Sequence, residues 1–573
     1  MTACTPASGV VTGAAPGRTD LDRLLDSLPL RAKAAQLVIP WLAGTYAAYD
    51  AGALTEAERW VDSLGVGGLI VSVGSPLDIA AKLNHLQSRS RLPLLVASDL
   101  EAGTAIRLVG GVAFPTNMGV AAGGRESDAY AMGRVTAREA RAVGIHLAFA
   151  PVADVNNNPA NPIINVRSFG EDPRAVARFV SAAVRGMEEH GLLATAKHFP
   201  GHGDTETDSH LSLPALPADW RRLDSLELVP FRAAVGAGAS AIMSAHIAFP
   251  ALASGTPRPG TVMPEVLTGL LRDSLGFQGL VVTDALDMGA LVSAYGAGEA
   301  AVLALIAGAD LLLQPAGTAN AVRAIVRAVE TGRLSEERLD RSVRRMLALK
   351  QRLGLFERRT VPLDSVSANV GSAAHWQVAR DVAARSVVLL KDSGGTLDAL
   401  RRAPRKVALV TYAEELNPTA GVTLAAELRA AGHSVTPFRL WPASGPASFD
   451  SVRALVRGEV VPVFAIAVRP TPWRGTVGMP EALAGLVRET ARGRPTALVS
   501  LGSPYLVTQA PEAAAYLIAW SATPAAEWAA ARALSGAAIG GRLPIRVPPV
   551  YPLGAGLDRA AIQPRPLSRG CAR

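Results

Sequence analysis

The chain has 573 residues, of which 49% are hydrophobic and 18% charged, with a formal net charge of +8. This length exceeds what one hydrophobic core of ordinary size organises, so we expect two domains, one of them large. The composition excludes an intrinsically disordered protein. Arginines are scattered rather than gathered with aromatic residues, which argues against a nucleic-acid partner, and no apolar run approaches the roughly 20 residues of a membrane span.

The two cysteines, Cys4 and Cys571, lie near opposite ends of the chain. They exclude a disulfide framework or a thiolate metal site inside the fold. Residues 1–4 resemble the end of a lipoprotein cleavage box without the apolar segment that normally precedes it, so the localisation stays open between cell envelope and cytoplasm. We expect residues 1–18 to form a disordered N-terminus.

Short apolar runs recur through residues 19–357, and helix-like segments such as residues 175–189 lie between them. Eight nearly continuous apolar strands that alternate with helices predict an α/β fold that begins with an N-terminal (β/α)8 TIM-type barrel over residues 19–357. An open doubly wound sheet is the alternative. The expected strands are Leu37–Ile39, Leu69–Val71, Leu94–Val96, Leu147–Phe149, Leu193–Thr195, Ala241–Met243, Leu280–Val282 and Leu311–Leu313.

A second α/β pattern follows the first. The polar segment that starts at Glu357 breaks the barrel pattern, and we expect a linker over residues 358–378. Apolar runs separated by alanine-rich helical stretches then predict a smaller three-layer α/β/α sandwich domain at residues 379–560, with a loose tail at 561–573. The expected strands are Val387–Leu390, Val407–Val410, Val463–Ile466, Ala497–Ser500 and Tyr516–Ile518.

Charged and polar residues follow several of the expected barrel strands. Because the C-terminal ends of barrel strands form the active-site rim, we expect these residues to face one pocket. Asp284 comes directly after Thr283, which suggests a rigidly held carboxylate, although an aspartate after a strand is also a common helix cap. The residues at the predicted rim are Asp99, Glu101, Asp154, Lys197, His198, His246 and Asp284.

The segment 197–210 is the densest cluster of chemically capable side chains. A metal site is one interpretation, with the ligands His198, His202, Asp204 and His210. Their spacing matches no established ligand motif and Lys197 would place a cation beside the ion, so we expect no metal and no cofactor. Acid/base chemistry is the other interpretation, because Asp208 could orient the imidazole of His210. Taken alone, that pair also fits a surface histidine beside a loop carboxylate.

These motifs together resemble glycoside hydrolase family 3, in the branch of β-N-acetylglucosaminidases that recycles or trims peptidoglycan. The resemblance extends over nearly the whole chain and implies the two-domain form of that family. Its main signature runs from Lys197 to Thr205 and continues with Asp208-Ser209-His210. Further matches are Asn165–Gly170, Met243–His246, Val281–Leu286 and the segment after Arg385.

The resemblance implies a retaining exo-β-N-acetylglucosaminidase that removes non-reducing terminal β-linked GlcNAc from peptidoglycan fragments or related oligosaccharides. Asp284 would be the nucleophile that forms a covalent glycosyl-enzyme intermediate. His210, oriented by Asp208, would be the acid/base group in place of the second carboxylate usual in retaining enzymes. The implied partner is a carbohydrate, and we expect a monomer. The residues that match substrate-binding positions of the family are Asp99, Arg107, Arg167, Lys197 and His198.

One motif departs from the family pattern, and other functions stay open. Residues 99–103 read Asp-Leu-Glu-Ala-Gly where the family usually has Asp-Gln-Glu-Gly-Gly. This difference leaves the shape of the expected pocket beside Asp99 undetermined. A glycoside phosphorylase is an alternative, since a histidine acid/base lacks the negative charge that repels phosphate. A β-glucosidase or β-xylosidase is another, and a non-catalytic carbohydrate-binding protein of the envelope is a remote one.

Overall fold

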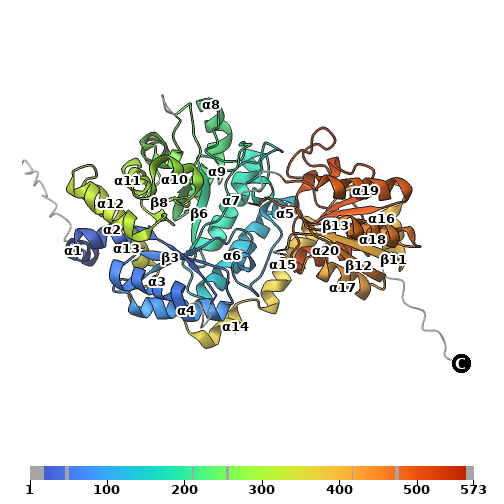
Figure 1. The fold of residues 1–573 in the computed structure, drawn as a ribbon, viewed down its shortest axis with the longest axis horizontal. Coiled ribbons are helices and arrows are strands. Elements are labelled where there is room, and N and C mark those ends of the chain that lie inside the picture. The colour runs from blue at the N-terminus through green and yellow to red at the C-terminus, as the bar shows by residue number, and fades with distance from the viewer. Residues whose placement is uncertain are drawn as a thin grey trace, which may run out of the picture.

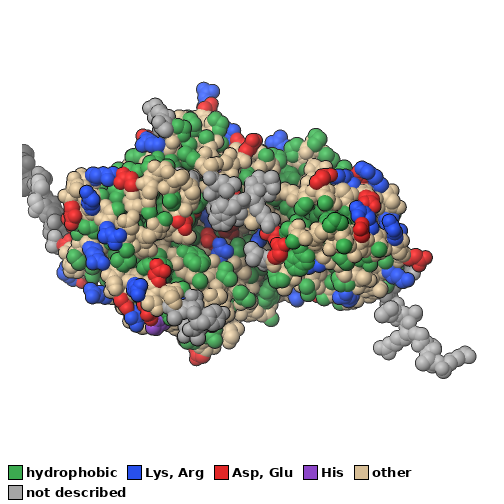
Figure 2. Space-filling view, viewed as in Figure 1, with side chains coloured by type: hydrophobic (Ala, Val, Ile, Leu, Met, Phe, Trp, Pro, Cys, Tyr) green, Lys and Arg blue, Asp and Glu red, His purple; other side chains and the backbone are tan. Residues whose placement is uncertain are grey.

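The computed structural model describes residues 19–45, 51–209, 212–252, 257–415, 417–471 and 477–562. Two large β-sheets organise this part of the chain, and they lie towards opposite ends of its long axis (Figure 1). Figure 2 shows acidic and basic side chains interspersed over the face in view. In the described ranges, no helix is long and apolar enough to cross a membrane.

The first sheet is parallel and curled. Seven neighbouring strands form it in chain order: β2 (Trp41–Ala43), β3 (Gly68–Ser72), β4 (Leu95–Ser98), β5 (Leu147–Ala148), β6 (Leu193–Phe199), β7 (Ala241–Ser244) and β8 (Leu280–Thr283). Next to this sheet, β1 (Val38–Ile39) pairs in parallel with β9 (Leu312–Leu313), and Leu311 forms a parallel bridge with Val282 of β8. The region is therefore an α/β fold of the TIM type.

Alternation along each strand divides the apolar side chains between two layers. Leu280 and Val282 lie in the cluster inside the curled sheet, whereas Val281 packs with the surrounding helices. Because both faces are buried, the strands are apolar at almost every position. The surrounding helices are α1 (Asp20–Ser27), α2 (Leu30–Gln36), α3 (Ala51–Arg59), α4 (Pro76–Arg89), α5 (Asn117–Ala122), α6 (Glu126–Ala142), α7 (Pro173–Glu188), α8 (Trp220–Arg222), α9 (Leu228–Gly236), α10 (Gly289–Tyr295), α11 (Ala297–Ala307), α12 (Thr318–Glu330) and α13 (Glu336–Arg352).

The chain passes to the second sheet through α14 (Val366–Asn369) and α15 (Ala373–Ser386). This sheet has the order β10-β15-β14-β13-β11-β12, and only the β10–β15 pair is antiparallel. The strands are β10 (Val388–Asp392), β11 (Lys406–Tyr412), β12 (Ser434–Leu440), β13 (Val461–Ile466), β14 (Ala497–Ser500) and β15 (Ala515–Ile518). Residues from β10 to 562 are called the C-terminal region below.

Helices cover both faces of the second sheet. Leu409 packs with the helices of one face and Val410 with those of the other, so this sheet is also buried on both sides. The first group contains α16 (Thr396–Arg402), α17 (Val422–Ala430) and α20 (Pro524–Leu534), and the second contains α18 (Pro446–Arg457) and α19 (Glu481–Gly493).

The expected strands all occur, with small shifts at their ends, and the structure has two more, β2 and β12. The strand β12 escaped notice because it lies at a sheet edge and carries Pro437, which an edge strand tolerates. The short strand β2 follows β1 after Pro40. Helix α15 begins at Ala373, inside the residues expected to form a linker, because Ser372 caps it by accepting a hydrogen bond from the His375 N–H.

Candidate functional site

The C-terminal edge of the curled sheet gathers charged side chains from several strands. Asp99 follows β4, Asp154 lies in the segment after β5, and Lys197 and His198 belong to the end of β6. Asp284 follows β8. Because all these strands are parallel, their C-terminal ends meet at one edge. The structure thus brings the predicted rim residues together on one side of the molecule.

Glu101 is the centre of a network of charges. Arg167 donates to both of its carboxylate oxygens, at 3.0 Å from Nε and 2.7 Å from Nη2. The Lys197 Nζ lies 2.8 Å from Glu101 Oε1. Burial alone would raise the pKa of Glu101, but the two cations hold it well below its usual range. Burial would likewise lower the pKa of Lys197, and the acids around it raise it instead, so all three groups stay charged.

Asp99 shares Lys197 with Glu101 and is partly exposed to solvent. Its Oδ1 lies 3.2 Å from Lys197 Nζ, and Arg107 Nη2 donates to its Oδ2 at 3.1 Å. Burial raises the pKa of Asp99, but Lys197 and Arg107 lower it by more. One third of the side chain, 33%, is exposed. An ionised carboxylate that is anchored on one side and open on the other can accept hydrogen bonds from a ligand's hydroxyl groups.

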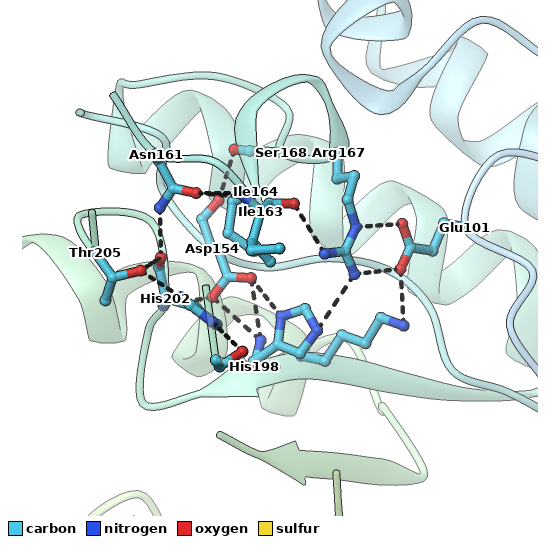
Figure 3. A network of polar contacts seen from close by, with 12 residues as sticks. Glu101, Asp154, Asn161, Ile163, Ile164, Arg167, Ser168, His198, His202 and Thr205 are labelled. Carbon is cyan, nitrogen blue, oxygen red and sulfur yellow. Dashed lines mark hydrogen bonds and ion pairs between the residues drawn. The ribbon is translucent and has the colours of Figure 1, made fainter. Parts of the chain in front are cut away.

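Asp154 and His198 form a buried pair beside this network. Asp154 Oδ2 lies 2.7 Å from His198 Nδ1, and Asp154 Oδ1 accepts the backbone N–H of His202 at 2.8 Å. Burial raises the pKa of Asp154, yet the hydrogen bonds and charge of His198 bring it below its usual value. Because the carboxylate accepts at Nδ1, that nitrogen carries a proton, and Nε2 lies 3.4 Å from Arg167 Nη2, on the side of the Glu101 network (Figure 3).

His202 holds the loop that follows β6. Its Nδ1 lies 2.7 Å from Thr205 Oγ1 and its Nε2 3.1 Å from Ser209 Oγ. Asn161 donates to the His202 carbonyl at 2.8 Å. Burial, reinforced by the neighbouring cations, lowers the pKa of His202 to about 4, so this imidazole is neutral at pH 7. The loop leads to Asp208, which is buried.

The predicted acid/base residue His210 lies outside the described residues. Its pairing with Asp208 stays a prediction.

Asp284 is held at the end of β8 by backbone hydrogen bonds. Its N–H donates to the Ser244 carbonyl at 3.2 Å, and its Oδ1 accepts from the Ala285 N–H at 2.8 Å. Helix α10 begins at Gly289 with Met288 at its N-cap position, so the helix-cap interpretation of Asp284 does not apply.

Positive groups also determine the ionisation of Asp284. Burial raises the pKa of this carboxyl, but His246 and His198 lower it by more, and Lys197 adds to their effect. His246 itself is fixed by Thr261 Oγ1 at 2.8 Å and by the Ala285 carbonyl at 2.9 Å. Asp284 is therefore an ionised, half-buried carboxylate on the same rim as the Glu101 network.

The residues considered as metal ligands have other contacts. Asp204 pairs with Arg222, His198 with Asp154, and His202 with Thr205 and Ser209. Within the described ranges, no group of three or more His, Cys, Asp or Glu side chains is arranged to hold a metal ion.

Glu101 and Asp154, both expected at the rim, are centres around which the predicted substrate-binding residues Arg167, Lys197 and His198 are oriented. Their position in the segments that follow β4 and β5 was the available signal. Asn161, which accepts the N–H groups of Ile163 and Ile164 and so shapes the turn before Arg167, carried no such signal.

A curled parallel sheet with ionised groups along its C-terminal edge defines an α/β enzyme of the TIM type. Residues 29–349 match the family model described as the glycosyl hydrolase family 3 N-terminal domain. The chain belongs to glycosyl hydrolase family 3 and is a glycoside hydrolase.

Named relatives agree with this assignment. The chain is 31% identical over 480 residues to a β-N-acetylglucosaminidase/β-glucosidase of Cellulomonas fimi, which covers 80% of this chain and 85% of that protein. It is 33% identical over 379 residues to β-hexosaminidase A of Pseudoalteromonas piscicida, covering 62% of each.

Two solved structures are similar over most of the chain. A family 3 β-N-acetylglucosaminidase from Paenibacillus sp. str. FPU-7 has a TM-score of 0.80 at 32% identity, covering 91% of this chain and 99% of the other. The β-glucoside phosphorylase BglX bound to 2FGlc has a TM-score of 0.83 at 26% identity, covering 92% and 96%.

Proposed function

We propose that the chain is a retaining exo-β-N-acetylglucosaminidase that removes non-reducing terminal β-linked GlcNAc from peptidoglycan fragments or related oligosaccharides. The observation that carries this proposal is the placement of the ionised Asp284 on the rim that also bears the Glu101 network. The names of the Cellulomonas fimi and Paenibacillus relatives support the choice of sugar.

In the proposed first step, an Asp284 oxygen attacks the anomeric carbon. The bond from that carbon to the leaving oxygen breaks, and this oxygen takes a proton from His210, which Asp208 orients. In the second step His210 accepts a proton from water, whose oxygen attacks the same carbon and releases Asp284. Because its pKa is lowered, Asp284 is already ionised at neutral pH, as a nucleophile requires.

The substrate-binding roles follow from the charges on the rim. In this proposal Asp99 accepts hydrogen bonds from sugar hydroxyls, while Arg107, Arg167, Lys197 and His198 donate to or orient the sugar. Glu101 and Asp154 act through these residues, since their contacts hold Arg167, Lys197 and His198 in place.

We also interpret the architecture as two domains. Residues 19–357 would form the (β/α)8 barrel, with β9 between β8 and β1 completing the ring, and residues 379–560 the α/β/α sandwich. The two patterns of apolar strands and the two separate sheets support this division. We expect the protein to act as a monomer without a cofactor.

Trapping the covalent intermediate tests the proposal. The protein would be incubated with a mechanism-based 5-fluoro glycoside of GlcNAc, digested and mapped by mass spectrometry. We expect the label on the peptide that contains Asp284, and no label on the Asp284→Asn variant. A label on another carboxylate would overturn the assignment of the nucleophile.

Phosphorolysis is the second candidate, because the structure is similar to a β-glucoside phosphorylase over most of both chains. Turnover of aryl β-GlcNAc with and without inorganic phosphate separates the two reactions. Release of free GlcNAc at an unchanged rate supports hydrolysis, whereas accumulation of GlcNAc 1-phosphate supports phosphorolysis. Aryl β-glucoside and β-xyloside in the same assay test the specificity for the sugar.

A further inference from the structure

Residues 151–172, which lie between β5 and α7, carry two parts of the rim. Asp154, which orients His198, lies near its start, and Arg167 lies near its end. Internal hydrogen bonds join the two parts: the Asn156 N–H donates to the Gly170 carbonyl at 2.8 Å, and Ser168 Oγ donates to the Asp154 carbonyl at 2.6 Å. We call this segment the β5–α7 loop. A displacement of one part is therefore transmitted to the other.

The C-terminal region binds the end of this loop through hydrogen bonds and an ion pair. Glu171 accepts the backbone N–H of Arg546 at 2.8 Å and its Nε at 2.7 Å, and the Glu171 N–H donates to the Pro544 carbonyl at 3.1 Å. Glu171 is well covered, with 10% of its side chain exposed. At Gly170, which has a φ of +153°, a β-carbon would lie 2.5 Å from the Pro544 oxygen. The two backbones approach so closely that only glycine fits.

A second contact reaches the start of the loop. Tyr505, in the 3₁₀ turn Pro504–Thr508 after β14, accepts a hydrogen bond from Asn156 Nδ2 at 3.3 Å. Burial raises the pKa of the Tyr505 hydroxyl, so it stays protonated.

A third contact acts through α5. Asn117 of that helix donates to the Arg167 carbonyl at 2.7 Å. A β-carbon on Gly119 would lie 2.7 Å from the side chain of Trp520, which is fully buried. The C-terminal region therefore contacts both the end of the β5–α7 loop and the helix that binds the Arg167 carbonyl.

We infer that the C-terminal region sets the position of Arg167 and of the Asp154–His198 pair, with Arg546 and Tyr505 as its positioning residues. This inference rests on the substrate-binding roles proposed for Arg167 and His198. Neither positioning residue needs to touch the sugar. Their contacts fix the loop that carries Asp154 and Arg167, and a shift of about 1 Å in a binding group can lower kcat/KM by as much as about a hundredfold.

The test changes only the C-terminal side of the contact. The double variant Arg546→Gln/Tyr505→Phe removes the guanidinium and the phenol hydroxyl and leaves the β5–α7 loop unaltered. Arg542→Gln is the matched control, because Arg542 pairs with the exposed Asp558 in the same segment. With an aryl β-glycoside, we expect KM to rise by about five- to tenfold in the double variant while kcat changes less than about threefold. The control keeps both constants.

A double-mutant cycle with Arg167→Lys distinguishes positioning from general stability. If the C-terminal region acts through Arg167, the KM effect shrinks to less than about twofold when Arg167 is already replaced. Unchanged kinetic constants in the double variant, or a full effect on the Arg167→Lys background, would overturn the inference.

Hydrogen exchange of the loop gives a readout that does not depend on the reaction. We expect faster exchange over residues 151–172 in the double variant and unchanged exchange in Arg542→Gln. Equal exchange in all three proteins refutes the inference even where the proposed activity holds. If the wild type has no glycosidase turnover but the double variant still exchanges faster, the structural inference stands and only the proposed function is refuted.

Discussion

The two sheets differ at their C-terminal edges although both are mainly parallel and buried on both faces. In the curled sheet, β6 ends in Lys197 and His198, which join a network of buried charges. In the second sheet, β14 ends in Ser500, whose hydroxyl donates to the nearby Ser503 carbonyl at 2.6 Å. The same architecture thus carries a charged rim in one region, whereas in the other the side chain at the strand end only hydrogen-bonds a nearby backbone carbonyl. Function resides in the side chains placed on a fold and not in the fold itself.

Buried carboxylates show the same contrast. Glu101 pairs with two cations, and they hold its pKa well below its usual range against the effect of burial. Glu527 of α20 accepts the backbone N–H groups of Gly421 and Leu424, at 2.7 and 3.0 Å, and burial raises its pKa. One acid is kept charged beside the proposed substrate site, and the other joins two helices.

The largest difference in kcat/KM is expected between substitutions at the ends of β8 and β14. Replacing Asp284 by alanine removes the proposed nucleophile, and kcat/KM for aryl β-GlcNAc should fall by about 10⁴-fold or more. The matched change in the second sheet is Ser500→Ala, for which we expect kcat/KM within about threefold of the wild-type value. Steady-state kinetics of both variants checks this difference. A larger fall in kcat/KM for Ser500→Ala than for Asp284→Ala would contradict it.

The two buried carboxylates give the next largest difference. Glu101→Gln leaves Lys197 and Arg167 without their shared counter-ion, so kcat/KM should fall by about a hundredfold and unfolding should become easier by about 3 kcal/mol. Glu527→Gln keeps an acceptor for the backbone amides and lies away from the rim, so its kcat/KM should stay within about twofold. Kinetics and thermal melts would contradict this contrast if the two variants behaved alike.

The pH dependence of stability should also show the contribution of His202, in the loop after β6. In the folded protein the pKa of His202 is about 4, below its ordinary value of 6.5, so the unfolded chain binds the extra proton first. The stability from neutral His202 is complete above pH 6.5 and is lost as the pH falls towards 4, by on the order of 3 kcal/mol.

Melting curves at pH 7.5 and 4.5 check this sign. The wild type should lose more Tm than His202→Asn over that interval. His433 of the second region also has a lowered pKa, from burial and Arg405, and His433→Asn serves as the comparison. Parallel losses in the wild type and in His202→Asn would show that His202 is not the group that titrates.

An exposed ion pair of the C-terminal region should matter least. Arg492 and Glu512 lie 2.6 Å apart, but 67% of the arginine side chain is exposed. Arg492→Ala should change the free energy of unfolding by less than about 1 kcal/mol and leave kcat/KM as in the wild type. A larger loss in denaturant titrations would mean that charges on this surface are coupled beyond the pair.

Much of the fold could be predicted because burial on two faces leaves a clear trace in the sequence. All eight strands expected in residues 19–357 occur, six of them in the curled sheet and two as the β1–β9 pair, and so do the five expected in the second sheet. The edge strand β12 could not be found in the same way, since its exposed positions and Pro437 break the apolar run. The start of α15 was missed because a capping serine is a weak signal against an expected linker.

For the site, the residues could be predicted from the sequence but their contacts could not. The sequence by itself determined which residues are candidates for the site, since Asp99, Lys197, His198 and Asp284 directly follow or end apolar strands and belong to motifs that resemble the family's. Only the tertiary structure decided how they pair. Glu101 and Arg167, 66 positions apart, form a bidentate ion pair, and Glu171 meets Arg546 from 375 positions away. Such contacts depend on strand order and loop paths, and these are properties of the packed chain that no local pattern of residue types encodes.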